Sequence, residues 1–141
     1  MESNTIEYIT DFTVFPEDIN YANSLFGGKL LSKMDIAAAT LARKMLYGTE
    51  ADGAVTASMD KVDFICPAHI GDLITVKCTL KSLGRSSMVI KTKVWKETKS
   101  GEIFKICTGI FTFVAMKDKK PYAHGLSFET IKIPQPYQEM G

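Results

Sequence analysis

Apolar residues recur at helical spacing over residues 29–47. Steps of three or four residues separate the members of one face, which are Leu31, Asp35, Ala38 and Ala42. Gly48 follows as a helix stop signal. The pattern predicts one long helix that carries a carboxylate, that of Asp35, on or beside its apolar stripe.

Five further segments have the composition or the alternation of β-strands. They cover residues 6–15, 55–65, 73–83, 87–98 and 103–115, and turn signals rich in glycine, proline or serine separate the last four. In the final segment both alternating faces are apolar, so we expect this strand to lie inside the sheet or to be shared with a partner. One helix followed by consecutive hairpin strands predicts an α+β domain, in which an antiparallel sheet wraps around the helix.

Length and composition fit one domain with an extension. The chain has 141 residues and a hydrophobic content of 45%, which is enough for a single core. After residue 116 the composition shifts to lysine, proline, tyrosine and glutamine, with prolines at positions 121, 134 and 136. We therefore expect a single domain over residues 1–116, followed by an extended C-terminal tail over residues 117–141.

Charge and motif content exclude several classes of function. The formal net charge is +1 and no block of lysine or arginine forms a stripe, which argues against nucleic-acid binding. No apolar run reaches the roughly 20 residues that cross a bilayer, so membrane insertion is not expected. Cys66, Cys78 and Cys107 lack metal-ligand spacing and indicate reduced thiols of a cytoplasmic protein. No motif indicates a metal site, and we expect His69 and His124 at the surface.

Asp35 is the candidate for chemistry. An ionised carboxylate on a packed helix is unfavourable unless it is paired, hydrogen-bonded or used. By position alone it could equally lie at the edge of the stripe and pair with Lys33 or Lys44. The preceding sequence favours a functional acid, because it brings Asn20, Asn23 and a glycine pair to a helix N-terminus, where free N–H groups and the helix dipole attract anions. Donors for an incoming oxygen, with an acid two turns deeper, suit acyl transfer.

Four motifs in this order resemble those of a known family. The first is Asn-x6-Gly-Gly-x6-Asp, formed by Asn20, Gly27, Gly28 and Asp35. The others are residues 55–64, residues 67–72, and the run from Leu83 to Met88 followed by Val94-Trp95. Together they cover about residues 14–115 and resemble the hotdog-fold acyl-CoA thioesterases, in particular the short bacterial acyl-CoA thioester hydrolases. The resemblance implies the hotdog fold, an antiparallel sheet wrapped around one long central helix.

The resemblance also implies an activity and an assembly. The reaction is hydrolysis of an acyl-CoA thioester to a free acid and coenzyme A, with no cofactor beyond the substrate itself. A backbone N–H of Gly27 or Gly28 would stabilise the oxyanion. Asn20 would orient water or the carbonyl, and Asp35 would act as a general base or as a nucleophile. The family's active site lies at a dimer interface, so we expect a homodimer at minimum, with larger assemblies of dimers common.

The same resemblance assigns a second set of residues to substrate and coenzyme A binding. The turn Gly84-Arg85-Ser86-Ser87 would offer a charged fork and hydroxyls to phosphate, although by itself Gly-Arg-Ser is an ordinary β-turn with a solvated arginine. The set also contains Asn23, Phe26, Val62, Asp63 and Phe64, the last three beside the pantetheine channel. Similar proteins often have glycine where this chain has Asn23, and asparagine tolerates the left-handed backbone region better than most residues.

Two other functions remain open from the sequence. A hotdog hydratase or dehydratase would act on a related thioester, but such enzymes resemble one another through a catalytic histidine that the set Asn20, Gly27 and Asp35 does not contain. A non-catalytic acyl-CoA-binding regulatory module would keep Arg85 and the cleft without turnover, because a fold does not fix a function. The preferred acyl-chain length is not determined by the sequence.

Overall fold

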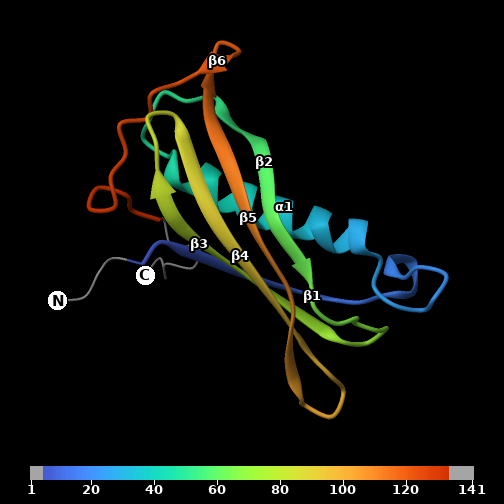
Figure 1. Cartoon of the computed structure of the whole chain (residues 1–141). Helices are drawn as coiled ribbons and strands as arrows, with labels where there is room; N and C mark the ends of the chain where they lie inside the picture. Colours follow the sequence, from blue (N-terminus) through green and yellow to red (C-terminus); the bar gives the residue numbers. More distant parts are fainter. Residues whose placement is uncertain (1–4, 134–141) are drawn as a thin grey trace, which may run out of the picture.

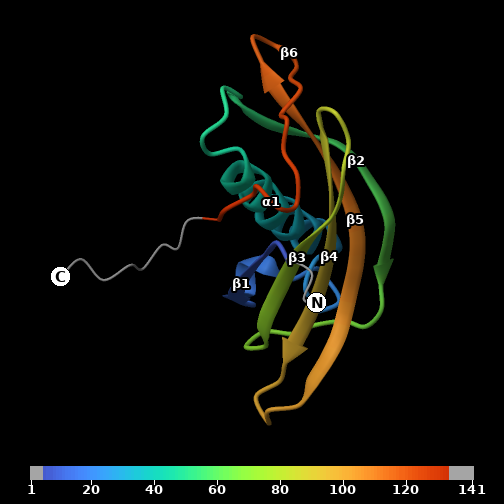
Figure 2. The same ribbon diagram turned by 90° about the vertical axis from the view of Figure 1, so that its left-hand side faces the viewer.

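One curved antiparallel sheet lies against one long helix (Figures 1 and 2). The computed structural model describes residues 5–133. In chain order the elements are β1 (Glu7–Thr13), the short 3-10 helix η1 (Pro16–Asp18), α1 (Gly27–Met45), β2 (Gly53–Phe64), β3 (Leu73–Leu83), β4 (Ser87–Glu97), β5 (Ile103–Lys117) and β6 (Lys120–Pro121).

The sheet has the strand order β1-β3-β4-β5-β2, and β6 pairs with β5. Every pairing is antiparallel, and β3, β4 and β5 follow one another as hairpins. Figure 2 shows α1 on the concave side of the arched sheet, where it contacts all five long strands. The predicted α+β plan, with a sheet wrapped around one helix, is therefore confirmed.

The helix begins two residues earlier than the periodicity predicts. Phe26 is its N-cap and has an extended backbone, so both glycines of the pair lie inside the first turn. At the other end the helix stops at Met45, and Gly48 takes a φ of +87°, a left-handed conformation that suits glycine after a helix. Within residues 5–133 no helix is long and apolar enough to cross a membrane.

The core lies between the inward face of the sheet and one face of α1. Alternation is clearest in β3 and β4, where every second residue is buried over most of the strand. In β5, Phe111 and Phe113 are fully buried, and the strand has neighbours on both sides, as its two apolar faces predict. Ile106 and Cys107 are both buried although they are adjacent, because the β4–β5 register shifts at this point.

The segment after β6 packs onto the body of the domain. The Tyr122 N–H donates to the Ala115 carbonyl, Leu126 and Phe128 lie against the core, and Ile131 is buried. The prediction that His124 lies at the surface is wrong: only 6% of it is exposed, because the returning chain covers it. His69 is exposed, as predicted. The prolines at 134 and 136 lie outside the described residues.

Candidate functional site

Asp35 lies at the edge of the buried face of α1. The helix turns by about 100° per residue, so the carboxylate points toward the β2 side, next to the buried Met34 and Ala38. It is half-buried, and its Oδ1 accepts a hydrogen bond of 2.8 Å from the Thr56 hydroxyl on β2. A neutral hydroxyl therefore orients the acid and leaves the rest of its acceptor capacity for another partner.

The alternative of a surface ion pair for Asp35 is not what the structure shows. The Lys33 ammonium lies 5.1 Å from the centre of the Phe12 ring, and the Lys44 ammonium lies 5.9 Å from that of Tyr8. Among residues 5–133, Asp35 takes part in no salt bridge. A half-buried carboxylate without a cation favours a chemical role over a structural one.

Thr56 is the site residue that sequence reasoning missed. It belongs to the motif over residues 55–64, but Thr56 and Ser58 both carry hydroxyls, and the β2–β5 register shifts between them. Strand alternation cannot predict across such an irregularity which hydroxyl faces the helix. Thr56 could have been found from its position: it lies in the edge strand, opposite the face of the helix that carries Asp35.

Asn20 uses its side-chain oxygen to shape the loop before the helix. Oδ1 accepts N–H groups from Ala22 at 2.9 Å and from Ser24 at 3.2 Å. Asn23 donates its N–H to the Asn20 carbonyl at 3.0 Å and has a φ of +65°, the left-handed conformation that asparagine tolerates. Because the oxygen is occupied, only the Asn20 amide nitrogen, which has no protein partner within residues 5–133, is free to orient a ligand.

The loop is anchored to the start of the helix by Asp18, which is 6% exposed. Its carboxylate accepts the Phe15 N–H at 2.9 Å and lies 3.4 Å from the Lys29 ammonium. Its carbonyl accepts the N–H of Phe26 at 2.9 Å. These contacts fix the position of Asn20 relative to the first turn of α1.

The glycine pair opens the helix N-terminus to a ligand. The backbone N–H groups of Gly27 and Gly28 have no partner within the described part of the chain, and no side chain caps the helix. Neither glycine has a positive φ, so backbone freedom does not explain them. A Cβ at Gly28 would make a tight contact of 3.1 Å with the Phe26 ring, whereas one at Gly27 would lie at an ordinary contact distance of 3.6 Å from the Phe64 ring.

An apolar hollow of about 210 Å³ lies beside this helix terminus. Its lining includes Gly27 together with Leu25, Leu30, Phe64 and Ile106. Phe26 and Phe64 are 56% and 55% exposed and form an apolar rim around the glycine pair. Phe64 ends β2, and its ring lies beside Gly27 at the helix start. Val62 and Asp63 precede it on β2, and Asp63 lines a different hollow, together with Lys61 and Lys91.

The Gly84-Arg85-Ser86-Ser87 turn does not join this group within one chain. It links β3 to β4 at the end of the sheet where Gly53 starts β2, whereas Gly27 lies at the Phe64 end. The 19-residue helix between the two ends is about 28 Å long. Figure 1 shows the two ends well apart. Arg85 is exposed and free to meet a ligand or another chain.

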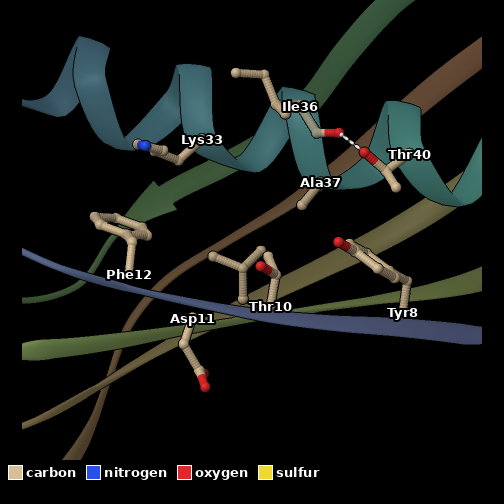
Figure 3. Close-up of a pocket in the computed structure, with 9 residues that line it drawn as sticks. Tyr8, Thr10, Asp11, Phe12, Lys33, Ile36, Ala37 and Thr40 are labelled. Atoms are coloured by element: carbon tan, nitrogen blue, oxygen red, sulfur yellow. Dashed lines mark hydrogen bonds between the residues drawn. The ribbon is translucent and has the colours of Figure 1, made fainter. Parts of the chain in front are cut away.

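Another hollow, of about 150 Å³, lies on the opposite flank of α1, between the helix and β1 (Figure 3). The Lys33 ammonium covers the Phe12 ring there, and the Asp11 carboxylate points away from the helix, where it accepts the Thr75 hydroxyl at 2.9 Å. The hollow therefore presents no acid to a ligand, and we place the candidate site on the Thr56 side of the helix.

Cys78 and Cys107 are not nucleophiles of this site. Burial raises the pKa of the Cys78 thiol to about 12 and that of the Cys107 thiol to about 11. Both thiols therefore stay protonated near neutral pH, and they serve as core residues of β3 and β5. All three cysteines, including the half-buried Cys66, are free thiols.

Known proteins match this chain in sequence and in fold. The model of the thioesterase superfamily matches residues 22–102. An uncharacterised acyl-CoA thioester hydrolase of Bacillus subtilis is 43% identical over 105 residues, which are 73% of this chain and 58% of that protein. The chain thus spans less than two thirds of that relative's length.

Two solved structures share the fold. The hexameric thioesterase y2039 of Yersinia pestis superposes with a TM-score of 0.77 at 30% identity, covering 84% of this chain and 94% of that one. An acyl-CoA hydrolase of Staphylococcus aureus, solved with butyryl coenzyme A and coenzyme A, gives a TM-score of 0.75 at 30% identity over 83% and 70% of the two chains. It was also solved with an asparagine, an aspartate or a threonine replaced by alanine. The chain therefore belongs to the thioesterase superfamily, among the hotdog-fold acyl-CoA thioester hydrolases.

Proposed function

We propose that this protein hydrolyses acyl-CoA thioesters to a carboxylic acid and coenzyme A. The observation that carries the proposal is the half-buried Asp35 carboxylate, held by Thr56 without a cation, on the helix whose first N–H groups are free. The names of the relatives support the substrate class. The reaction needs water and the thioester alone. The free thiols fit a reducing compartment, and we place the reaction in the cytoplasm.

Two chemical routes use the same residues. The thioester carbonyl oxygen accepts a hydrogen bond from the backbone N–H of Gly27 or Gly28, where the helix dipole stabilises the oxyanion. In the first route Asp35 removes a proton from water, the water oxygen attacks the carbonyl carbon, the C–S bond breaks, and the thiolate leaves and takes up a proton. In the second route the Asp35 carboxylate attacks the carbonyl carbon, the C–S bond breaks, and the thiolate leaves and takes up a proton. Water then hydrolyses the resulting mixed anhydride, which releases the carboxylic acid and restores the Asp35 carboxylate.

We propose that the active site forms between two chains that pair through β2. This strand is an edge of the sheet, and its residues from Val55 to Lys61 are all exposed, unlike the alternating interior strands. An unpaired edge of this kind is a template for another strand. Val55, Met59 and Phe64 add exposed apolar side chains to it. The hexameric state of the Yersinia pestis relative supports an assembly of such dimers.

This pairing also accounts for the distant Arg85. If two β2 strands pair antiparallel about a twofold axis, the Gly53 end of one meets the Phe64 end of the other. The turn with Arg85 lies at the Gly53 end of its own sheet, so the second copy's Arg85 comes to the end that holds Gly27. A guanidinium is suited to the phosphates of coenzyme A at that position.

The proposal is tested by thiol release from acyl-CoAs of increasing chain length with the purified protein. We expect turnover, with a limit on chain length set by the hollow beside Gly27. Saturable binding of acyl-CoA without thiol release from any chain length would instead identify a non-catalytic binding module.

The bond between Thr56 and Asp35 gives a second expected result. Thr56→Val keeps the shape of the side chain but removes the hydroxyl that orients the Asp35 carboxylate. Hydrogen bonds to charged groups contribute about 1.5–3 kcal/mol, so we expect kcat to fall roughly ten-fold or more. Thr56→Ser keeps the donor and should stay within a few-fold of the original kcat. Steady-state hydrolysis of the preferred acyl-CoA measures both, and a Val variant with full kcat would show that the bond has no catalytic role.

A further inference from the structure

The turn Gly84-Arg85-Ser86-Ser87 is held by a segment 35 to 40 residues further along the chain. The backbone N–H of His124 donates to the Arg85 carbonyl at 3.1 Å, and its ring nitrogen Nε2 lies 3.0 Å from the Ser87 carbonyl. The N–H of Ala115, on β5, donates to the Ser86 carbonyl at 2.8 Å. Three consecutive carbonyls of the turn are therefore bound from the protein side.

The hydrogen bonds of the His124 ring fix its proton. Nδ1 accepts the Leu126 N–H at 3.0 Å, so it carries no hydrogen, and the hydrogen of the neutral ring lies on Nε2, where the Ser87 carbonyl accepts it. The ring is 6% exposed and both of its nitrogens are used. A buried histidine with this pair of bonds is a rigid brace between the returning segment and the turn.

The opposite side of the turn is open. Within the described part of the chain, the backbone N–H groups of Arg85 and Ser86 have no partner, and the Arg85 side chain is exposed. The turn is also tight: a Cβ at Gly84 would clash with the Ser87 hydroxyl oxygen. With its carbonyls bound inward, the turn leaves two N–H groups and an exposed guanidinium for a ligand, and these are groups that bind phosphate.

We infer that His124 is a positioning residue for recognition of coenzyme A: by bracing the Ser87 and Arg85 carbonyls it holds Arg85 in the conformation that meets the phosphates of the substrate. This inference rests on the proposed function. A turn that is already ordered loses less conformational freedom when a ligand binds, so the brace lowers KM for substrates that carry the phosphates. It leaves the thioester chemistry at Asp35 unchanged, because the phosphates lie far from the thioester along the coenzyme A molecule.

The test compares two substrates and two variants. One substrate is the acyl-CoA that turns over best, and the other is the same acyl group on N-acetylcysteamine, which has the thioester but no phosphates. His124→Asn places an amide where Nδ1 stands, so it can still accept the Leu126 N–H but cannot reach Ser87. His124→Gln places its amide nitrogen where Nε2 stands and can still donate to the Ser87 carbonyl.

We expect His124→Asn to raise KM for the acyl-CoA about five-fold with kcat unchanged, and to leave kcat/KM for the short thioester as it was. His124→Gln should recover most of this loss, and Arg85→Ala should reproduce it. Equal losses on both substrates, or no loss for His124→Asn where Arg85→Ala shows one, would overturn the positioning role. So would Arg85→Ala without effect on the acyl-CoA.

Folding and the proposed function are checked separately. Thermal unfolding and size-exclusion chromatography show whether each variant is folded and assembled; if His124→Asn is not, a folded His124→Gln with the KM of Arg85→Ala would still overturn the inference. Failure of the unmodified protein to hydrolyse either thioester would contradict the proposed function itself. Turnover of both with identical KM would contradict only the role of the turn.

Discussion

Asp35→Asn is expected to lower kcat for acyl-CoA hydrolysis by about a thousand-fold or more, with the fold and assembly intact. Asparagine has nearly the same shape and can still accept the Thr56 hydroxyl through its oxygen. It can neither take a proton from water nor attack as a nucleophile, so both routes fail. The measurement is thiol release under saturating acyl-CoA, together with thermal unfolding and size-exclusion chromatography of the same preparation.

Asp118→Asn is the matched control for this experiment. Asp118 is an exposed carboxylate in the turn between β5 and β6, and it takes part in no salt bridge within residues 5–133. The control makes the same change of charge outside the β2 edge and should keep kcat within about two-fold, because exposed surface charges contribute little. A folded Asp35→Asn protein with the kcat of Asp118→Asn would mean that another group activates water.

Elements with strong local patterns were predictable from the sequence. The helix follows from its 3.6-residue period, and β3, β4 and β5 follow from alternation between turns rich in glycine and serine. β3 has the predicted bounds, and the others differ by a few residues at their ends. The helix begins at Gly27 rather than residue 29, because glycine, a poor helix former, is tolerated in the first turn that follows the extended backbone of Phe26.

The parts of the site that the sequence did not predict depend on contacts between distant segments. The partner of Asp35 is Thr56 on β2, next to a register shift. At such a shift the alternation of residues no longer predicts which side chain faces the helix. His124 reads as a tail residue, and only the return of the chain over the β3–β4 turn buries it. The pattern of a single sequence reveals only local periodicity, and neither of these contacts changes the periodicity of the sequence.

The family resemblance predicts an oxyanion site at the glycine pair, and the structure adds a physical reason for Gly28. The Phe26 ring lies against the position that a Cβ would occupy, at 3.1 Å. A Cβ there would require the ring to shift by a few tenths of an ångström, and a larger side chain would narrow the approach to the free N–H groups. Gly28 therefore lets the Phe26 ring lie beside the free N–H groups. This arrangement suits a thioester, because the N–H groups can meet its polar oxygen and the ring can meet its apolar acyl chain.

Two inactive variants are expected to restore activity when they are combined, if the site is shared between chains. The first is Asp35→Asn. The second is Asn20→Asp, which keeps the oxygen that accepts the Ala22 and Ser24 N–H groups but replaces the free amide nitrogen. Loss of one positioned donor lowers kcat about 100-fold or more, so each variant alone should be nearly inactive.

In a mixed dimer of these variants, one site would carry both changes and the other would carry neither. Random pairing of equal amounts makes half of the dimers mixed, and each has one intact site, so co-expression should restore about a quarter of the original activity. If Asp35 and Asn20 act within one chain, every site in the mixture keeps a defect and no activity returns. Pairing Asp35→Asn with the double variant Asp35→Asn/Asn20→Asp is the control, since it leaves no intact site in either arrangement. Recovery in the first mixture and none in the control would therefore place the carboxylate and the amide of one active site on different chains.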